Sequence, residues 1–194
     1  MTGHELFLPV ALGISLAAAT GFRVFLPLLV MGIGAREGLL PMSQGFDWVT
    51  TWPALMMLGV ASVTEIAAYY VPGLDNLLDS LAAPAAVGAG ILASAAALGP
   101  GFDASPMLKW ALAIVAGGGA AAVTQSATTL LRGKSTVFTG GAGNHVIATG
   151  EIVGALGLSL LAVILPYVAA GIVCVTGLLV FRMWWKRKMT KALR

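Results

Sequence analysis

Long apolar runs, separated by short polar or Gly/Pro-rich segments, make up most of the chain. A helix that crosses a bilayer needs about 20 mostly apolar residues, because each residue advances the helix axis by about 1.5 Å. By this measure the pattern predicts six membrane helices, at about 6–34, 52–71, 81–99, 107–131, 146–164 and 167–186. We therefore expect an all-α membrane protein.

Two features of this pattern predict interrupted helices. The first run, 6–34, is too long for one straight span and contains Pro9, Gly21 and Pro27. These residues predict a tilted or broken helix there. The last two runs meet at Pro166, whose ring and missing N–H disfavour a continuous helix, so we divide the runs at that residue.

The two halves of the chain resemble each other at three places, in the same order. Residues 60–66 align with 146–152 and share a Glu-Ile pair. The other matches pair 17–23 with 120–126, and 87–91 with 168–172. Three spans per unit predict a 3+3 inverted repeat, the plan of many secondary transporters. The units would be residues 1–100 and 101–181, followed by a basic tail over 182–194.

Composition excludes a soluble domain. The chain is 58% hydrophobic and 10% charged, whereas soluble domains are about 25% charged. Many of the 11 Lys and Arg residues lie in the tail from Arg182 onward, so the basic balance does not indicate nucleic acid. The expected partner is the lipid bilayer. The single cysteine, Cys174, leaves no intramolecular disulfide and no CxxC site.

The positive-inside bias predicts an orientation. It places the tail from Arg182 in the cytoplasm, and six spans then place the N-terminus there as well. The connection over 132–145, which carries Arg132 and Lys134, also lies on the cytoplasmic side in this arrangement.

Three charged residues fall inside hydrophobic runs, where a charge costs about 2.5–3.5 kcal/mol on insertion scales. Arg23 lies deep in the first run, Glu65 lies in the second, and Glu151 opens the fifth. Two interpretations remain open. The charges form an internal Arg–Glu pair that fixes helix packing, or they line a polar pathway or proton-linked site at the repeat interface.

The segment 71–80 joins the second and third runs, and Pro72-Gly73 breaks the preceding helix. Asp75 and Asp79 are four residues apart, so a short helix would carry both on one face. The segment predicts either an interfacial amphipathic turn or a re-entrant element that presents Asp75 and Asn76 to a cavity.

The Gly-rich segment 138–145, which ends in Asn144 and His145, comes shortly before Glu151. It predicts either a flexible cytoplasmic loop or a boundary between half-helices, because irregular backbone at membrane depth must line protein or water.

Gln125, Thr128 and Arg132 share one face of the fourth span and predict a polar stripe that turns inward. Stretches rich in small residues, over 82–97 and 117–122, allow close helix approach. We expect such faces to pack within the protein or between the protomers of a homodimer.

Three elements carry a resemblance to a known family: Gly21-Phe22-Arg23 with Leu26-Pro27-Leu28-Leu29, Glu65-x6-Pro72-Gly73-x-Asp75, and Thr139-Gly140-Gly141-x-Gly143-Asn144 before Glu151. Over roughly residues 10–175 the chain resembles the domain of unknown function family 4126 of small bacterial membrane proteins. The resemblance implies a multi-span protein of the bacterial inner membrane and no assigned activity. In that family a Pro often follows the Gly-Asn element, where this chain has His145. A weaker likeness, to DedA-type lipid carriers, rests on the Glu-x6-Pro-Gly-x-Asp element alone.

We expect a small transporter or channel for an ion or small polar solute, without cofactor or metal. The alternatives are a lipid head-group translocase and a non-transporting membrane assembly or partner-binding protein. An enzyme is disfavoured, because the chain lacks HExxH and GxSxG motifs and Cys174 has no polar neighbour. The expected site residues are Arg23, Glu65, Asp75, Asn76, Asn144 and Glu151, with Asp79, Gln125, Thr128, Arg132 and His145 as secondary candidates.

Overall fold

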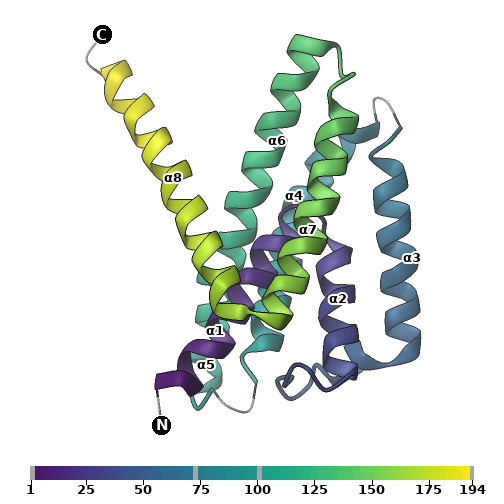
Figure 1. Ribbon diagram of the computed structural model, residues 1–194, viewed down its shortest axis with the longest axis vertical. Coiled ribbons are helices and arrows are strands. Elements are labelled where there is room, and N and C mark those ends of the chain that lie inside the picture. The colour runs from purple at the N-terminus through teal and green to yellow at the C-terminus, as the bar shows by residue number, and fades with distance from the viewer. Residues whose placement is uncertain (1–2, 72–73, 100–101, 193–194) are drawn as a thin grey trace.

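The computed structural model describes the chain apart from residues 1–2, 72–73, 100–101 and 193–194. Within these limits the chain is helical and contains no strand, so the predicted all-α class is confirmed (Figure 1). The elements are α1 (Gly3–Thr20), α2 (Phe25–Arg36), the 3-10 turn η1 (Asp47–Thr50), α3 (Trp52–Ala68), α4 (Leu74–Ala97), α5 (Pro106–Leu112), the π-helical η2 (Ala113–Gly118), α6 (Gly119–Thr139), α7 (Asn144–Ile164) and α8 (Pro166–Ala192).

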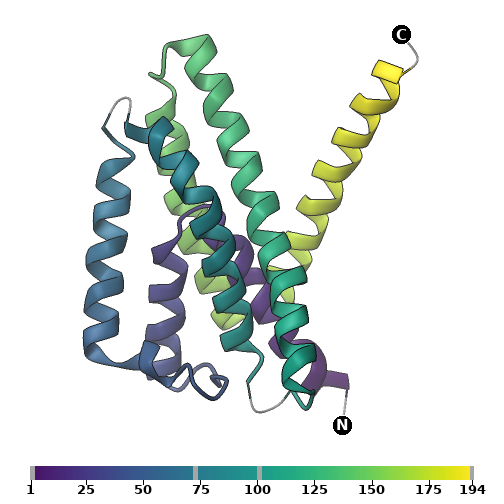
Figure 2. The same ribbon diagram turned by 180° about the vertical axis from the view of Figure 1, so that it is seen from behind.

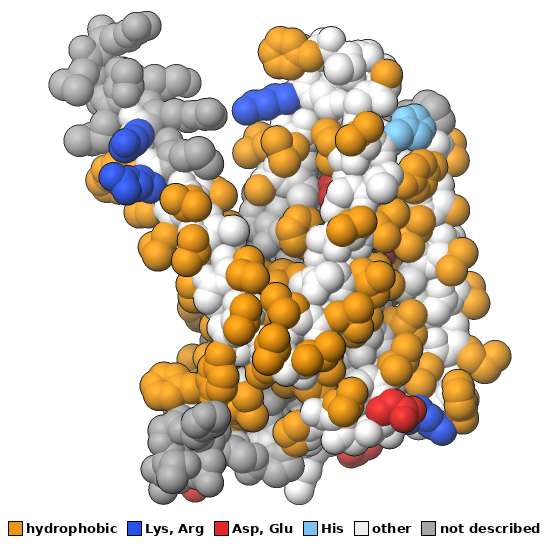
Figure 3. All heavy atoms as spheres, in the orientation of Figure 1, with side chains coloured by type: hydrophobic (Ala, Val, Ile, Leu, Met, Phe, Trp, Pro, Cys, Tyr) orange, Lys and Arg blue, Asp and Glu red, His pale blue; other side chains and the backbone are white. Residues whose placement is uncertain are grey.

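Three segments are long and apolar enough to cross a membrane. They are residues 77–97 of α4, the continuous segment 106–139 formed by α5, η2 and α6, and α7. Hydrophobic side chains cover the middle of the face in Figure 3, and its Lys, Arg and His side chains lie toward the two ends. The chain therefore has the length and composition of a membrane protein.

The helices α1 and α2 form a re-entrant pair rather than one broken span. α1 runs antiparallel to α4: a Cβ added at Gly13 would lie 3.0 Å from the Ser94 hydroxyl oxygen. Seven residues later, the Thr20 hydroxyl donates a hydrogen bond to the Ala86 carbonyl oxygen (3.1 Å). Since Ala86 is near the middle of α4, α1 ends at mid-depth of the bundle.

From this point α2 returns toward the end at which α1 began, alongside α7. The Phe22 ring lies 3.5 Å from the position of a Cβ at Gly154, in the middle of α7. Further along, Gly34 lies beside Val163 at the end of α7. The broken helix predicted over 6–34 is therefore confirmed, but the two parts do not continue in one direction: the chain turns back at residues 21–24, which we call the tip.

This turn changes the topology. The re-entrant pair returns to the end of the molecule from which it started. As a result, α8 finishes at one end of the molecule and α1 begins at the other (Figures 1 and 2). Six crossings would have placed both at the same end. The beginning of α1 and the end of α8 therefore lie at opposite ends of this bundle.

The tip is held by very close helix contacts. A Cβ added at Gly21 would lie 2.5 Å from the Ala121 carbonyl oxygen on α6. A Cβ at Gly90 of α4 would lie 2.6 Å from the Ala121 Cβ, and one at Gly117 would lie 2.5 Å from the Ser94 Cβ. Small residues thus allow α1, α4 and α6 to approach within the protomer, as the composition of these stretches predicted.

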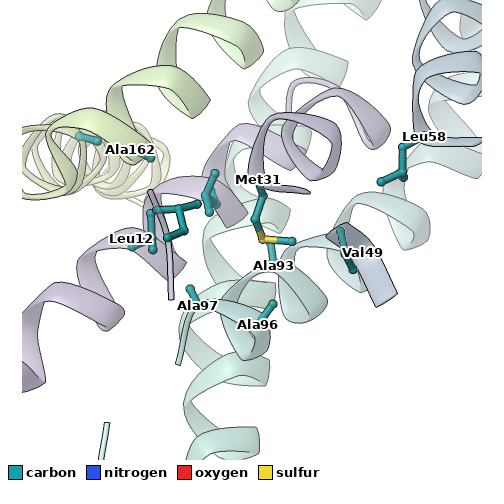
Figure 4. Close-up of a cluster of buried hydrophobic side chains, with 11 residues drawn as sticks. Leu12, Met31, Val49, Leu58, Ala93, Ala96, Ala97 and Ala162 are labelled. Atoms are coloured by element: carbon teal, nitrogen blue, oxygen red, sulfur yellow. The ribbon is translucent and has the colours of Figure 1, made fainter. Parts of the chain in front are cut away.

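A cluster of buried apolar side chains fills the half of the bundle that surrounds α1 and α2. It joins Leu12 of α1 and Met31 of α2 to Leu58 of α3, Ala93 of α4 and Ala162 of α7 (Figure 4). These side chains form an apolar core on the side of the tip from which α1 enters.

Two further expectations are corrected. α6 continues to Thr139, so most of the expected loop 132–145 is helix, and the turn to α7 is confined to 140–143. Gly140 and Gly141 make this turn with positive φ angles of 62° and 91°. The tail after residue 181 continues α8 as a helix to Ala192. The segment 71–80 is not a re-entrant element, because residues 74–80 form the first turns of α4.

Candidate functional site

Five side chains meet beyond the tip and form what we call the charge cluster. Arg23 comes from the tip, Tyr69 follows α3 directly, Asp79 lies on α4, Arg132 on α6 and Glu151 on α7. Arg23 and Arg132 are each 1% exposed, and Glu151 is 3% exposed. The cluster is thus enclosed by protein in the interior of the helix bundle.

Glu151 joins the two guanidinium groups. Its Oε2 atom lies 3.0 Å from Arg23 Nη2 and accepts a hydrogen bond from Arg132 Nη2. Arg132 Nε lies 3.4 Å from Asp79 Oδ2, and Arg23 Nη2 also donates to the Ala148 carbonyl oxygen (3.2 Å). Two cations and two anions therefore balance within the cluster.

Tyr69 packs against both arginines. Its ring centre lies 3.9 Å from Arg23 Cζ and 4.3 Å from Arg132 Cζ, distances typical of cation–π contacts. The Tyr69 hydroxyl donates a hydrogen bond to Asp79 Oδ1 (3.2 Å). The ring thus fixes the planes of both guanidinium groups, and the hydroxyl ties α3 to α4.

Part of the hydrogen-bonding capacity of the cluster is unused. Among the described residues, the cluster atoms without a hydrogen-bond partner are Arg23 Nε and Nη1, Arg132 Nε and Nη1, and Glu151 Oε1, although Arg132 Nε is ion-paired with Asp79. Leaving a buried polar atom without a partner costs about 1–3 kcal/mol, and more for a charged group. Four donor nitrogen atoms and one acceptor oxygen atom of the cluster therefore have no hydrogen-bond partner.

Glu65 lies beside the cluster but has a different role. Its Oε1 and Oε2 atoms accept hydrogen bonds from the backbone N–H groups of Val24 (2.8 Å) and Phe25 (3.1 Å). These groups are at the beginning of α2, where N–H groups have no partner within the helix and a negative charge is favoured. Glu65 therefore caps α2 from α3, and the ion pair of Arg23 is with Glu151.

A groove with a volume of about 700 Å³, which we call the α3–α4 groove, lies next to the cluster. Its walls are mostly apolar and include Met57, Val60 and Leu81. Its polar groups come from Glu65, Tyr69 and Thr64. Tyr69 thus lies between the groove and the two arginines.

The polar stripe on α6 turns inward, as predicted. Gln125 and Thr128 are buried along with Arg132. The Thr128 hydroxyl donates to the Gln125 carbonyl oxygen (3.0 Å), and Gln125 Nε2 donates to the Thr129 hydroxyl (3.4 Å). These bonds stay within α6, so Arg132 is the member of the stripe that joins the charge cluster.

Other predicted residues lie apart from the charge cluster. Asn144 is buried at the beginning of α7, where its Nδ2 donates to the Thr136 hydroxyl (3.0 Å) and ties α7 to α6. His145 is exposed, and its ring centre lies 5.8 Å from that of Tyr70. The side chains of Asp75 and Asn76 lie outside the described part of the structure.

The structure thus brings together Arg23 and Glu151 with the secondary candidates Asp79 and Arg132, and it places Glu65 alongside. Sequence reasoning missed Tyr69 as a member of the site. The signal was its spacing of one helical turn from Glu65, which puts both residues on one face of α3.

Comparison with known proteins places the chain in a family. Residues 10–186 match the family described as Domain of unknown function (DUF4126). Comparison with curated proteins and with solved structures gave no match. Because the matched segment covers most of the chain, the protein belongs to the DUF4126 family.

Proposed function

We propose that the protein transports an ion or a small polar solute and binds it at the charge cluster. The observation that carries this proposal is the set of unused donors on two buried arginines beyond the tip of a re-entrant pair. Ionisable groups inside membrane proteins are costly and commonly mark substrate or ion pathways. Broken helices at mid-depth are a recurrent way to build such sites.

The geometry supports binding of a group that accepts hydrogen bonds. An oxygen or halide of the solute would accept from Arg23 Nη1 or Nε and from Arg132 Nη1. Glu151 would hold both guanidinium groups in place, and Glu65 would keep the tip in position through the N–H groups of α2. A neutral cluster also lets a proton or a second ion accompany the solute.

Helix directions support a reduced form of the inverted repeat. In Figures 1 and 2, α3 and α7 run in opposite directions, as do α4 and α8. Glu65 and Glu151 match in the sequence alignment of the two halves. The first aligned pair, α1 and α6, runs parallel. We therefore limit the proposed repeat to the pairs α3–α4 and α7–α8.

Orientation follows from the basic residues. The end of α8 and the turn between α6 and α7 lie at the same end of the molecule (Figure 1). The positive-inside bias places that end in the cytoplasm, in the bacterial inner membrane that we propose as the location. The beginning of α1 then faces the opposite side. The homodimer stays a prediction, which native mass spectrometry would check.

Flux into liposomes tests the transport proposal. Purified protein would be reconstituted, and gradients of protons, potassium, chloride and phosphate would be applied in turn. Glu151→Gln removes the shared counter-ion of both arginines, and Glu37→Gln is the matched control because Glu37 is exposed after α2. We expect the wild type and Glu37→Gln to transport at least one solute, and folded Glu151→Gln to lose at least about tenfold in rate, which corresponds to about 1.4 kcal/mol.

Two results would contradict the proposal. In one, folded Glu151→Gln transports at the wild-type rate, which would remove the cluster from the pathway. In the other, the wild type moves no solute. A head-group scrambling assay would then test lipid translocation, and a negative result there would leave a structural role for the ion pairs.

A further inference from the structure

The α3–α4 groove has the size of a ligand site. Its volume of about 700 Å³ falls within the range of about 300–1,000 Å³ that is usual for small-molecule pockets. Residues of α2, α3 and α4 contribute to its walls, and α3 and α4 line its two sides. The groove is separate from the charge cluster, with which it shares Tyr69.

The charges around the groove do not balance. Two arginines and three carboxylates are the described charged side chains around the tip, so the sum of their formal charges is −1. Arg23 and Arg132 are paired with Glu151 and Asp79, so the excess charge is on Glu65. The beginning of α2 offsets part of this charge through its N–H groups, but a helix end supplies only about half a charge.

The lining suits the apolar body of a cationic ligand. Phe25 contributes an aromatic ring, whose face attracts cations. Met56 and Met57 contribute thioether side chains, which adapt to ligands of different shape. Each Glu65 oxygen accepts one backbone hydrogen bond, so each keeps a lone pair that can face a ligand.

We infer that the α3–α4 groove binds a lipophilic cation, with the apolar body between α3 and α4 and the positive charge near Glu65. An anionic amphiphile would bring a second negative charge to Glu65. A neutral chain would leave the carboxylate without a counter-charge in an apolar environment, which is costly. This site goes beyond the proposed transport function and does not depend on it.

Binding of two probes of nearly the same shape and opposite charge tests the inference. The full chain in nanodiscs of uncharged lipid would be titrated with tetraphenylphosphonium and with tetraphenylborate, and binding to empty nanodiscs would be subtracted. We expect saturable binding of the phosphonium that is at least about tenfold tighter than binding of the borate, a difference of about 1.4 kcal/mol. Equal affinities, or no saturable binding of the phosphonium, would overturn the inference.

Variants then locate the site. Glu65→Gln keeps the shape of the side chain and should weaken phosphonium binding at least about tenfold. Ala85→Trp places a large side chain in the groove while Glu65 itself is unchanged, and it should weaken binding of the phosphonium to a similar extent. Ala83→Trp is its control, because Ala83 is exposed on α4 outside the groove.

The pair Ala85→Trp and Ala83→Trp tests whether the cation binds in the groove even if Glu65→Gln fails to fold. Loss of phosphonium affinity in Ala85→Trp, with wild-type affinity in Ala83→Trp, supports the site. Wild-type affinity in Ala85→Trp overturns it and assigns the groove to lipid chains.

Discussion

Removal of the Glu151 charge provides the sharpest test of how the cluster is held together. Glu151→Gln leaves Arg23 and Arg132, each 1% exposed, with Asp79 as the remaining carboxylate that pairs with either. Breaking a buried ion pair by removing one partner costs about 3–5 kcal/mol, because the other charge stays buried without compensation. We expect a loss of that size in the free energy of unfolding.

A second substitution in the same variant should restore part of the stability. Arg23→Met replaces one cation with an apolar side chain of similar length. As a single substitution it leaves Arg132 as the shared partner of Glu151 and Asp79. Arg23→Met combined with Glu151→Gln leaves one cation and one anion, Arg132 and Asp79, which are already paired at 3.4 Å. The double variant should therefore lose less than the sum of the two single losses, by about 0.5–3 kcal/mol.

Denaturant unfolding in detergent micelles, followed by tryptophan fluorescence, would measure all four proteins of this cycle. Glu37→Gln is again the control for an exposed carboxylate and should change stability by less than about 0.5 kcal/mol. If the two single losses add within about 0.5 kcal/mol, the charges do not interact and the reasoning fails. A loss below about 1 kcal/mol for Glu151→Gln would likewise show that burial does not make this pairing important.

Three further predictions concern the tip and its surroundings. Gly21→Ala places a Cβ 2.5 Å from a carbonyl oxygen of α6 and should lower the free energy of unfolding by about 1–3 kcal/mol. Its Tm should therefore be lower than that of the control Gly59→Ala, where a Cβ meets nothing within 4 Å. Equal Tm values would contradict the close contact. Tyr69→Phe keeps the ring against the arginines and removes one hydrogen bond, so it should cost about 0.5–1.5 kcal/mol in the same unfolding assay, and an unchanged stability would mean that the bond is not formed. Gly3→Cys, at the beginning of α1, and Leu39→Cys, after α2, should be labelled by a membrane-impermeant thiol reagent from the same side of the membrane, and labelling from opposite sides would contradict the re-entrant topology.

The general class and part of the site could be predicted from the sequence. Hydrophobic length identifies membrane helices, and the cost of burying charge identifies Arg23 and Glu151. The inward face of α6 follows from the spacing of Gln125, Thr128 and Arg132. These predictions succeed because each depends on residues within one helix.

The re-entrant pair could not be predicted from hydropathy. An apolar run of the length of residues 6–34 fits either one tilted span or two half-spans, because hydropathy does not record chain direction. The difference comes from contacts of Gly13, Gly21 and Gly34 with helices far along the chain. The role of Glu65 was hidden for a related reason, since its partners are backbone N–H groups and not a charged side chain.

The re-entrant pair also has a consequence for the order in which the protein is assembled during synthesis. The tip enters the bilayer first, but its counter-ion, Glu151, is made only after α3, α4 and α6. Until then the guanidinium group of Arg23 has no carboxylate from α7, and the N–H groups of α2 have no cap until Glu65 is made. A ribosome-bound chain that ends before α7 therefore holds Arg23 without its ion-pair partner Glu151. The contacts of α1 and α2 with α7 can thus form only late in synthesis, although these two helices are the first to be translated.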